Sequence, residues 1–373
     1  MTPAPAATAT ATATATTTTI ATTTGTAITT GTATMAIATA SAAAVRVLSA
    51  LAALCLHAAA SAAPCVEPPP DPANTYDAPH TYAKLARDYP AIRIASAALP
   101  VDVNRVDGLT YAQHGDRCLK LDLYLPLAAR ADVGMPVVVL VHGGGWRSGF
   151  RTEFAPMAVR LAQQGYAAAA ISYRLSGEAP YPAAIHDARA AVRWVRAHAA
   201  QYHLDPQRIA LAGGSAGGQI ASLAGVTGHL AQFDPGAEEG AVSSAVQAIV
   251  NIDGLSDFTT ELALTHEDDP AKHPSAAGAW LGGRYAEQPE RWSEASPIRY
   301  VRPGMPPILF IASAQPRFSA GREDMAARMA QAGVPSRTLV LPDTPHSFWL
   351  FDPWLQPTVD ATVAFLNQQM PAR

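Results

Sequence analysis

The sequence predicts an open α/β fold with a mostly parallel central sheet that helices cover on both faces. From residue 119 onward, short apolar runs alternate with longer segments of helical periodicity, which is the pattern of repeated strand–helix–strand units. Residues 137–141 and 308–312 are apolar at every position, as is typical of strands buried on both faces. With 373 residues the chain is long enough for one large domain or two smaller ones.

The individual elements follow from these periodicities. Residues 119–125 alternate between apolar and polar side chains and predict a half-buried antiparallel strand. Further strands are expected at residues 137–141, 167–173, 208–212, 246–252, 308–312 and 337–341. Helices are expected at residues 154–164, 182–200, 216–226 and 358–369. Because ligands of such sheets bind at the carboxyl ends of the strands, motifs that directly follow a strand are the candidates for a functional site.

The amino-terminal 62 residues are expected to lie outside the folded domain. Residues 1–34 are an Ala/Thr tract that is too poor in large apolar groups to repay the entropy of ordering it. Arg46, the apolar run 47–56 and the small residues 60–62 have the order of a secretory signal peptide, which is removed on export. The apolar run is too short to span a bilayer, so no stable membrane anchor is expected and the protein is predicted to be secreted or periplasmic.

The remaining chain divides into two parts. Residues 63–100 form a Pro-rich irregular arm, and residues 101–373 form the α/β domain, in which a polar and aromatic insertion at 254–300 is expected to act as a cap. Export to an oxidising compartment permits a disulfide between Cys65 and Cys118, although two free thiols fit the sequence equally well.

Charge and composition restrict the partners. The formal net charge is −4, from 26 basic and 30 acidic residues, and the basic residues form no block. Nucleic acid is therefore not an expected partner. The histidines lack metal-like spacing with cysteine or carboxylates, so neither a metal nor another cofactor is expected. The oligomeric state is left open.

The strongest local motif is the G-x-S-x-G pattern at residues 213–217, between a predicted strand and a predicted helix. In that setting the glycines allow a sharp turn that exposes Ser215 at its tip, with the Ala216 amide opening the helix. A phosphate-binding loop would need a following lysine, which this sequence lacks, and an ordinary turn is the other alternative. Ser215 is the predicted nucleophile.

A glycine-rich loop, His142-Gly-Gly-Gly-Trp146, follows the buried strand 137–141. Backbone amides in such a loop can stabilise a developing oxyanion, and Gly144 and Gly145 are the expected donors together with Ala216. Taken alone, the loop could equally be a tight turn.

A serine hydroxyl needs a neighbouring base, and His346 is the expected one. It follows the last predicted strand, on a loop that should return to the same edge of the sheet. The other histidines lie on or beside a surface helix or in a polar stretch.

Taken in order, these motifs resemble the α/β-hydrolase superfamily, and more narrowly the hormone-sensitive-lipase-like esterases with their bacterial acetyl- and feruloyl-esterase branch. The resemblance covers roughly residues 100–370 and includes the HGGGW loop, the GGSAGG turn and the late PHSF segment. It implies a Ser–acid–His triad, no metal, and ester hydrolysis through an acyl-enzyme.

The position of the acidic residue of the triad departs from the family pattern. Members usually place an Asp in the loop after the strand that corresponds to 308–311, and here Gln315 stands at about that place. A displaced carboxylate is therefore expected. Asp253, which follows the preceding strand, is the first choice, Asp324 is the alternative acid and Asp343 the third. Each of them could instead cap a helix or carry a solvated charge.

Aromatic and basic residues near these motifs suggest substrate contacts. Trp146 and Trp349 are the expected substrate-binding residues, with core packing as the alternative. Arg317 and Arg322 could pair with a carboxylate such as that of a uronic acid, or could be ordinary surface charges.

The sequence therefore predicts a secreted serine esterase that hydrolyses short-chain or aryl carboxylic esters. Acetyl or feruloyl groups on plant cell-wall polysaccharide are the substrates that the resemblance favours. A general short-chain carboxylesterase or lipase is one alternative. A non-catalytic small-ligand-binding protein of the same fold is another, because the Gln315 position breaks the usual triad.

Overall fold

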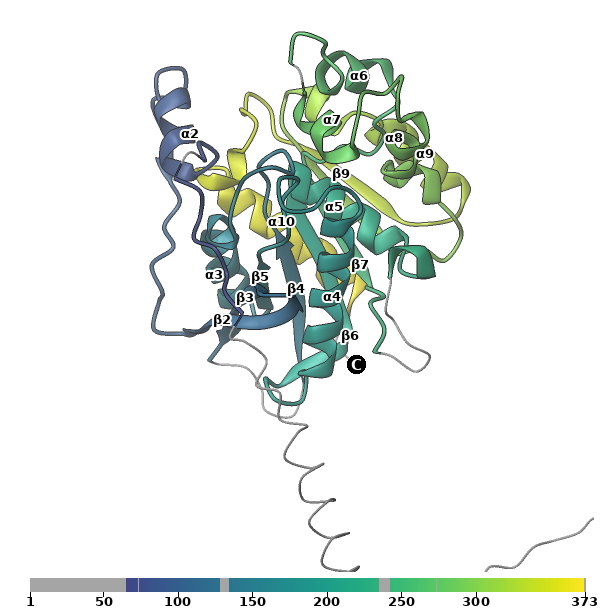
Figure 1. The fold of residues 1–373 in the computed structure, drawn as a ribbon. Helices are drawn as coiled ribbons and strands as arrows, with labels where there is room; N and C mark the ends of the chain where they lie inside the picture. The colour runs from purple at the N-terminus through teal and green to yellow at the C-terminus, as the bar shows by residue number, and fades with distance from the viewer. Residues whose placement is uncertain (1–64, 73, 128–133, 235–241, 273, 372–373) are drawn as a thin grey trace, which may run out of the picture. The chain divides into compact units, whose positions relative to one another are not determined.

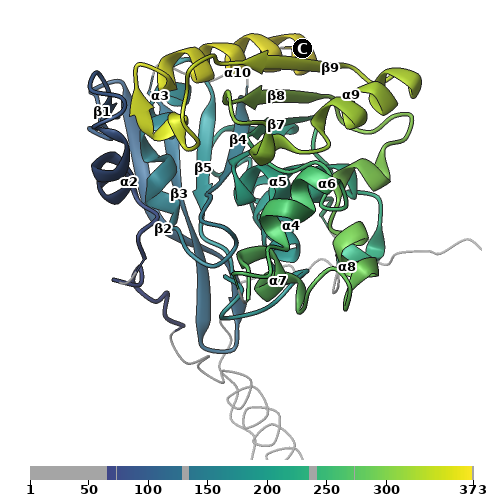
Figure 2. The ribbon, with the colours of Figure 1, turned by 90° about the horizontal axis from the view of Figure 1, so that it is seen from above.

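An eight-stranded sheet forms the centre of the fold (Figures 1 and 2), with the strand order β2-β3-β5-β4-β6-β7-β8-β9. The strands are β2 (Val103–His114), β3 (Arg117–Pro126), β4 (Met135–Val141), β5 (Ala167–Ile171), β6 (Leu204–Gly214), β7 (Ala248–Ile252), β8 (Ile308–Ala312) and β9 (Ser336–Val340). The pairs β2–β3 and β3–β5 are antiparallel, and every other neighbouring pair is parallel. The prediction of a mostly parallel sheet is confirmed.

The computed structural model describes residues 65–72, 74–127, 134–234, 242–272 and 274–371. The predicted Ala/Thr tract and signal peptide lie outside these residues. The described helices are α2 (Ala78–Leu85), α3 (Ala155–Gln163), α4 (Ala183–Ala197), α5 (Ala216–Val226), α6 (Glu261–Glu267), α7 (Ala276–Leu281), α8 (Pro289–Glu294), α9 (Arg322–Gln331) and α10 (Leu355–Gln369).

Two layers of helices cover the two faces of the sheet. Alternate residues of β4 point to opposite sides, so Val137 and Val139 pack with α4 and α5 while Val138 and Leu140 pack with α3 and α10. Figure 2 shows α4 and α5 on the side of the sheet opposite α10. Both faces of the central strands are therefore buried from solvent, which explains their continuous apolar sequence.

The antiparallel end of the sheet differs in part from the prediction. β3 is antiparallel as expected, but it is not half-buried. Leu119, Leu121 and Leu123 belong to the core on one face of the sheet and Tyr124 to the core on the other, so residues on both faces of β3 are inaccessible to water. Its polar Asp122 is buried beside Arg151, at 2.9 Å from the guanidinium, so alternation here does not mark a solvated face. The edge strand β2 was not predicted, since its mostly exposed residues carry no regular apolar pattern.

The amino-terminal arm is more regular than predicted. It contains helix α2, whose first turn is capped by the Asp77 carboxylate accepting a hydrogen bond from the His80 amide at 2.7 Å. It also contains β1 (Arg93–Ile94), which pairs with β10 (Phe351–Asp352). Cys65 and Cys118 form a disulfide that joins the start of the arm to β3.

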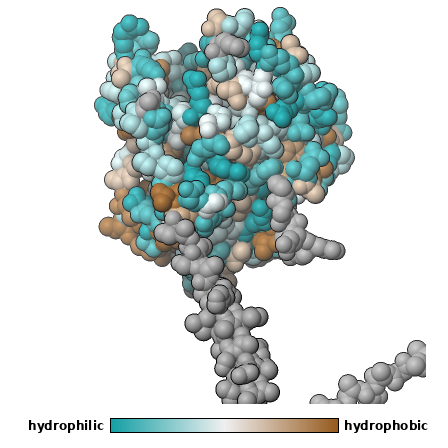
Figure 3. All heavy atoms as spheres, viewed as in Figure 1, coloured by the Kyte–Doolittle hydropathy of each residue, from teal (hydrophilic) through white to brown (hydrophobic). Residues whose placement is uncertain are grey.

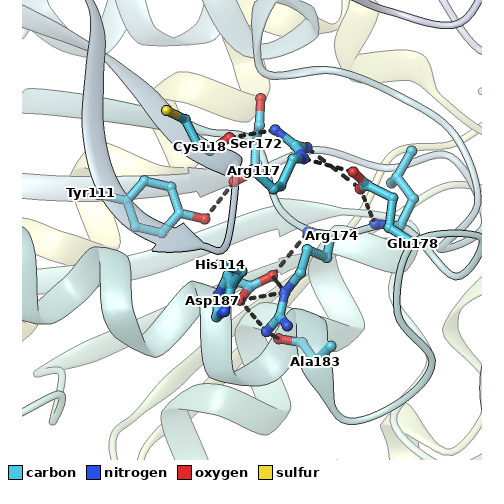
Figure 4. Close-up of polar contacts among 10 residues, drawn as sticks. Tyr111, His114, Arg117, Cys118, Ser172, Arg174, Glu178, Ala183 and Asp187 are labelled. Atoms are coloured by element: carbon cyan, nitrogen blue, oxygen red, sulfur yellow. Dashed lines mark hydrogen bonds and ion pairs between the residues drawn. The ribbon is translucent and has the colours of Figure 1, made fainter. Parts of the chain in front are cut away.

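A partly buried group of polar side chains, shown in Figure 4, lies where the β2–β3 hairpin meets the segment after β5 and α4. The Asp187 carboxylate on α4 is 1% exposed and accepts hydrogen bonds from the Arg174 side chain at 2.7–3.1 Å. His114, at the end of β2, lies 3.3 Å from the same carboxylate. Arg117 pairs with Glu178 at 2.6 Å.

The face drawn in Figure 3 is mainly hydrophilic, with apolar residues in small separate areas. Within the described ranges, no helix combines the length and the apolar character that crossing a membrane requires.

Candidate active site

The nucleophile turn connects β6 to α5. Ser215 has φ 55°, a left-handed conformation that is strained for a residue with a side chain, and its amide donates to the Ile252 carbonyl at 2.8 Å. Gly213 and Gly217 have ordinary φ values. They are needed for close packing, because a Cβ at either position would collide with the Val141 carbonyl of β4. The strain of the turn is thus carried by the serine itself.

Three side chains lie in a row at the carboxyl edge of the sheet. His346 Nε2 is 2.9 Å from Ser215 Oγ, and its Nδ1 is 3.1 Å from Asp253 Oδ2. Asp253 directly follows β7, its amide donates to the Ile311 carbonyl at 2.9 Å, and its side chain is fully buried. The second carboxylate oxygen, Oδ1, accepts from the Ser313 amide at 2.8 Å. Both oxygens of the acid therefore have partners that fix its orientation.

The structure brings Asp253, and neither of the other two candidate acids, to the imidazole. Asp324 lies exposed in the first turn of α9 and Asp343 is exposed in the loop before His346. Those two assignments are wrong, because the strand order places the end of β7 directly beside the end of β6, where the nucleophile turn begins. The Gln315 amide donates to Ser313 Oγ at 3.2 Å, so Gln315 belongs to the turn that supports the acid.

The surroundings of His346 favour its neutral form. Burial lowers the pKa of the imidazole, the hydrogen bond and charge of Asp253 oppose this in part, and the positive charge of Arg317 lowers the pKa further. Phe318 stacks on the imidazole with ring centroids 3.4 Å apart, and the Arg317 guanidinium lies 4.0 Å above the Phe318 ring. A neutral imidazole whose Nε2 faces a hydroxyl can accept its proton.

The glycine loop borders the same space. Gly145 and Ala216 line the cavity in front of Ser215, and no described residue accepts a hydrogen bond from either amide. Gly144 is not among the lining residues. Its carbonyl accepts hydrogen bonds from the Ser148 amide at 3.1 Å and from the Ser148 hydroxyl at 2.8 Å. Gly144 has φ 110° and Gly145 φ 58°, so the loop needs glycine at both positions.

The cavity has a volume of about 460 Å³, within the range of small-molecule sites. Trp146 lines it and stacks on Trp280 of the insertion, with ring centroids 5.0 Å apart. Trp349 does not line it. Its ring is 2% exposed and fills the space that a side chain at Gly214 would need, which makes it a packing residue and corrects the expected substrate contact.

The insertion at 254–300 supplies the wall opposite the amino-terminal arm, and Figure 1 shows α2 and the α6–α7 segment on opposite sides of the same end of the sheet. Arg317 lies in the lining, but Arg322 does not and pairs instead with Glu323. Within the described part of the chain, no three His, Cys, Asp or Glu side chains are arranged to hold a metal ion. The charged residues of the lining, apart from the Asp253–His346 pair, are Arg147, Lys272, Arg317, Glu267 and the titratable His266.

Several lining residues were not predicted, among them Tyr76 of the arm and Ser347, which follows His346. Tyr76 stands in a Pro-rich segment without periodicity or motif, so no sequence signal points to it. Ser347 could have been considered from its place beside the expected base.

Comparison with known proteins identifies the family of this chain. The BD-FAE family model matches residues 121–317, just over half of the chain. The chain belongs to the BD-FAE family. Strands β4 to β8, the nucleophile turn and Asp253 fall inside the matched range, whereas β2, β9 and His346 lie outside it.

Relatives and solved structures extend the comparison of this BD-FAE member. Esterase LipQ of Mycobacterium tuberculosis is 34% identical over 212 residues, which cover 54% of this chain and 49% of LipQ. A truncated carbohydrate esterase from gut microbiota has a TM-score of 0.61 at 23% identity, over 73% of this chain and 98% of that one. A bifunctional GH43-CE protein of Bacteroides eggerthii has a TM-score of 0.60 at 28% identity, over 71% of this chain and 38% of that one.

These likenesses establish the α/β-hydrolase fold of the BD-FAE member. The chain spans about half the length of the first curated relatives that it matches.

Proposed function

We propose that this BD-FAE protein is a serine carboxylesterase. The observation that carries the proposal is the row formed by Ser215, His346 and Asp253, with donor–acceptor distances of 2.9 and 3.1 Å. This arrangement provides a nucleophile, a base in contact with it, and a buried carboxylate that orients the base.

The geometry supports acyl transfer in two steps. Ser215 Oγ attacks the ester carbonyl while its proton passes to His346 Nε2, and Asp253 stabilises the resulting imidazolium. The negative carbonyl oxygen is held by the amides of Gly145 and Ala216. His346 then gives the proton to the departing alcohol, and a water molecule, activated by the same imidazole, cleaves the acyl-enzyme to release the acid.

The alternative of a non-catalytic binding protein loses its basis in this structure. That alternative rested on Gln315 at the place of the acid, but Asp253 supplies the carboxylate from the neighbouring strand and is fully desolvated against His346. A binding protein would have no use for a strained serine in contact with a neutral imidazole.

For the substrate we propose short acyl or aryl esters, in particular acetyl or feruloyl groups on plant cell-wall polysaccharide. A cavity of about 460 Å³ admits an aryl acyl group, and Trp146 offers an aromatic wall. Two of the solved structures with this fold are called a carbohydrate esterase and a GH43-CE protein. Arg317 in the lining could meet a carboxylate of an acidic sugar. The disulfide suits the proposed secretion.

The decisive experiment replaces Ser215 by alanine and measures hydrolysis of p-nitrophenyl acetate. Ser215→Ala should abolish turnover and also stoichiometric labelling by a fluorophosphonate, whereas Ser243→Ala, at an exposed serine, should change neither. Retained turnover in the Ser215 variant would contradict the proposal. Parallel assays on acetylated xylan, acetylated pectin and methyl ferulate then test the substrate class, and activity on p-nitrophenyl esters alone would favour a general short-chain carboxylesterase.

A further inference from the structure

The charges in the lining of the active-site cavity are unbalanced. Outside the triad, the lining contains three permanent cations, Arg147, Lys272 and Arg317, and one carboxylate, Glu267. The chain as a whole has a formal net charge of −4, so the excess of positive charge is a property of the cavity and not of the whole protein. A cleft lined mainly by one sign of charge concentrates ligands of the opposite sign.

Arg317 is held beside the catalytic base by a stack of planar groups. Its guanidinium carbon lies 4.0 Å from the centroid of the Phe318 ring, and that ring stacks on the His346 imidazole with centroids 3.4 Å apart. A contact with an aromatic face fixes the position of the charge. It does not supply a conventional acceptor for the five N–H groups of a guanidinium. The stack therefore places Arg317 without using its donors.

The Arg317 guanidinium has no polar partner. In the part of the chain that the structure describes, no carboxylate lies within ion-pair distance of it and no residue accepts a hydrogen bond from it. Every other arginine that is buried or partly buried there donates a hydrogen bond to a carboxylate or a backbone carbonyl. Arg317 is also partly buried, so its donors are available to a ligand in the cavity that it lines.

Glu267 does not neutralise this charge. It lies outside ion-pair distance of Arg317, and burial raises the pKa of its carboxyl, an effect that the positive charges of Arg317 and Lys272 oppose only in part. Lys272 already has a carboxylate partner, Asp269, at 3.5 Å. The charge of Arg317 is therefore left to be balanced by solvent ions or by a bound anion.

The reaction determines which part of an ester meets Arg317. During acylation the carbonyl oxygen faces the amides of Gly145 and Ala216, whereas the leaving oxygen has to receive a proton from His346 Nε2. The alcohol part of the ester therefore lies on the side of the imidazole. Because Arg317 is joined to the imidazole through the Phe318 ring, it borders the alcohol part and not the acyl part.

We propose that Arg317 selects esters whose alcohol part carries a carboxylate, so that the substrate is an acylated acidic sugar. The planar guanidinium binds the carboxylate through two parallel N–H donors, while Ser215 attacks the acyl group. This selection rests on the proposed esterase function and narrows its polysaccharide substrates to those that contain uronic acids.

The test uses two acetates that differ by one charge on the alcohol part, 4-acetoxybenzoate and its methyl ester. The readout is the ratio of kcat/KM for the charged ester to kcat/KM for the neutral ester, at an alkaline pH where His346 is neutral. Arg317→Gln should lower this ratio by about tenfold, the lower end of what a hydrogen bond to a charged group contributes. Arg328→Gln removes the same charge from an exposed position on α9 and should leave the ratio within about twofold.

A second pair of esters carries the charge on the acyl part, namely mono-4-nitrophenyl succinate and 4-nitrophenyl butyrate. Arg317→Gln should change the ratio for this pair by less than about threefold, because the acyl part lies away from the guanidinium. Thermal unfolding of both variants confirms that they are folded at the assay temperature.

A ratio for the acetoxybenzoate pair that is the same in Arg317→Gln and in the unmodified protein overturns the proposal, as does an equal fall in Arg328→Gln. A fall of the same size or larger in the succinate pair overturns the assignment to the alcohol part. If Ser215-dependent hydrolysis of the neutral ester persists while the ratio does not change, the selection fails and the proposed function stands. Hydrolysis of neither ester overturns the proposed function together with the selection that rests on it.

Discussion

Replacing Asp253 by asparagine tests the catalytic geometry most directly. Asparagine has the same shape and tolerates the left-handed conformation at this position, where φ is 49°. Its side-chain oxygen can still accept from the Ser313 amide, as Oδ1 of Asp253 does at 2.8 Å. The NH₂ group then faces His346 Nδ1, so two donors would meet unless the imidazole carries its proton on Nε2. In that tautomer His346 cannot accept the proton of Ser215.

The size of the expected rate loss in Asp253→Asn follows from this change of the His346 tautomer. In serine proteases, the same change from aspartate to its amide lowers the rate by about 10⁴-fold with little change in geometry. This corresponds to about 5.5 kcal/mol of lost transition-state stabilisation. Because the Asp253 side chain is 0% exposed, solvent cannot supply a substitute charge, and we expect Asp253→Asn to lose a comparable factor.

The assay is kcat/KM for p-nitrophenyl acetate, with Asp324→Asn as the matched control. Asp324 is exposed on α9, so its amide should leave the rate within about twofold. The reasoning is refuted if Asp253→Asn loses less than about tenfold, or if Asp324→Asn loses as much. Thermal unfolding of both variants excludes a folding defect as the cause.

Three further results are expected. Arg317→Gln removes a positive charge that lowers the pKa of His346, so the acidic limb of the pH dependence of kcat/KM should move to higher pH, and an unmoved limb would mean that this charge has no effect on the imidazole. Asp187→Asn leaves the Arg174 guanidinium, which is 18% exposed, without its carboxylate, and urea unfolding should show a loss of about 3 kcal/mol; a change below 1 kcal/mol would argue against this pair. Reducing the Cys65–Cys118 disulfide, which spans 53 positions, should lower the free energy of unfolding by up to about 4 kcal/mol in the chain-entropy estimate, measured by denaturant titration with and without dithiothreitol, and an unchanged value would indicate that the arm is held by other contacts.

The parts of the site that could be predicted from the sequence are those in which a few neighbouring residues determine the backbone conformation. The nucleophile turn around Ser215 requires residues without a Cβ at positions 213 and 217, and this requirement is visible in the sequence. The glycine loop before Trp146 is visible for the same reason. The parallel strands could be predicted because burial on both faces demands an apolar side chain at every position.

The catalytic acid and the contribution of the arm to the cavity were harder to predict, because the residues that they contact are distant in the chain. Three aspartates were compatible with the sequence, and the choice depends on which strand end lies beside β6. Trp349 illustrates the same limit, since the sequence places an aromatic ring near His346 but does not say whether the ring faces the cavity or the core. Tyr76 lies 139 positions before Ser215 and carries no motif at all.

The sequence by itself determined the α/β class, the nucleophile turn and the loop that carries His346, since these depend on local periodicity and on backbone conformations within a few residues. The tertiary structure alone decided that Asp253 faces the imidazole, that Trp349 is packed away from the cavity and that Tyr76 enters it. The physical reason is that such contacts depend on strand order and on the path of the arm, which result from the packing of the whole domain.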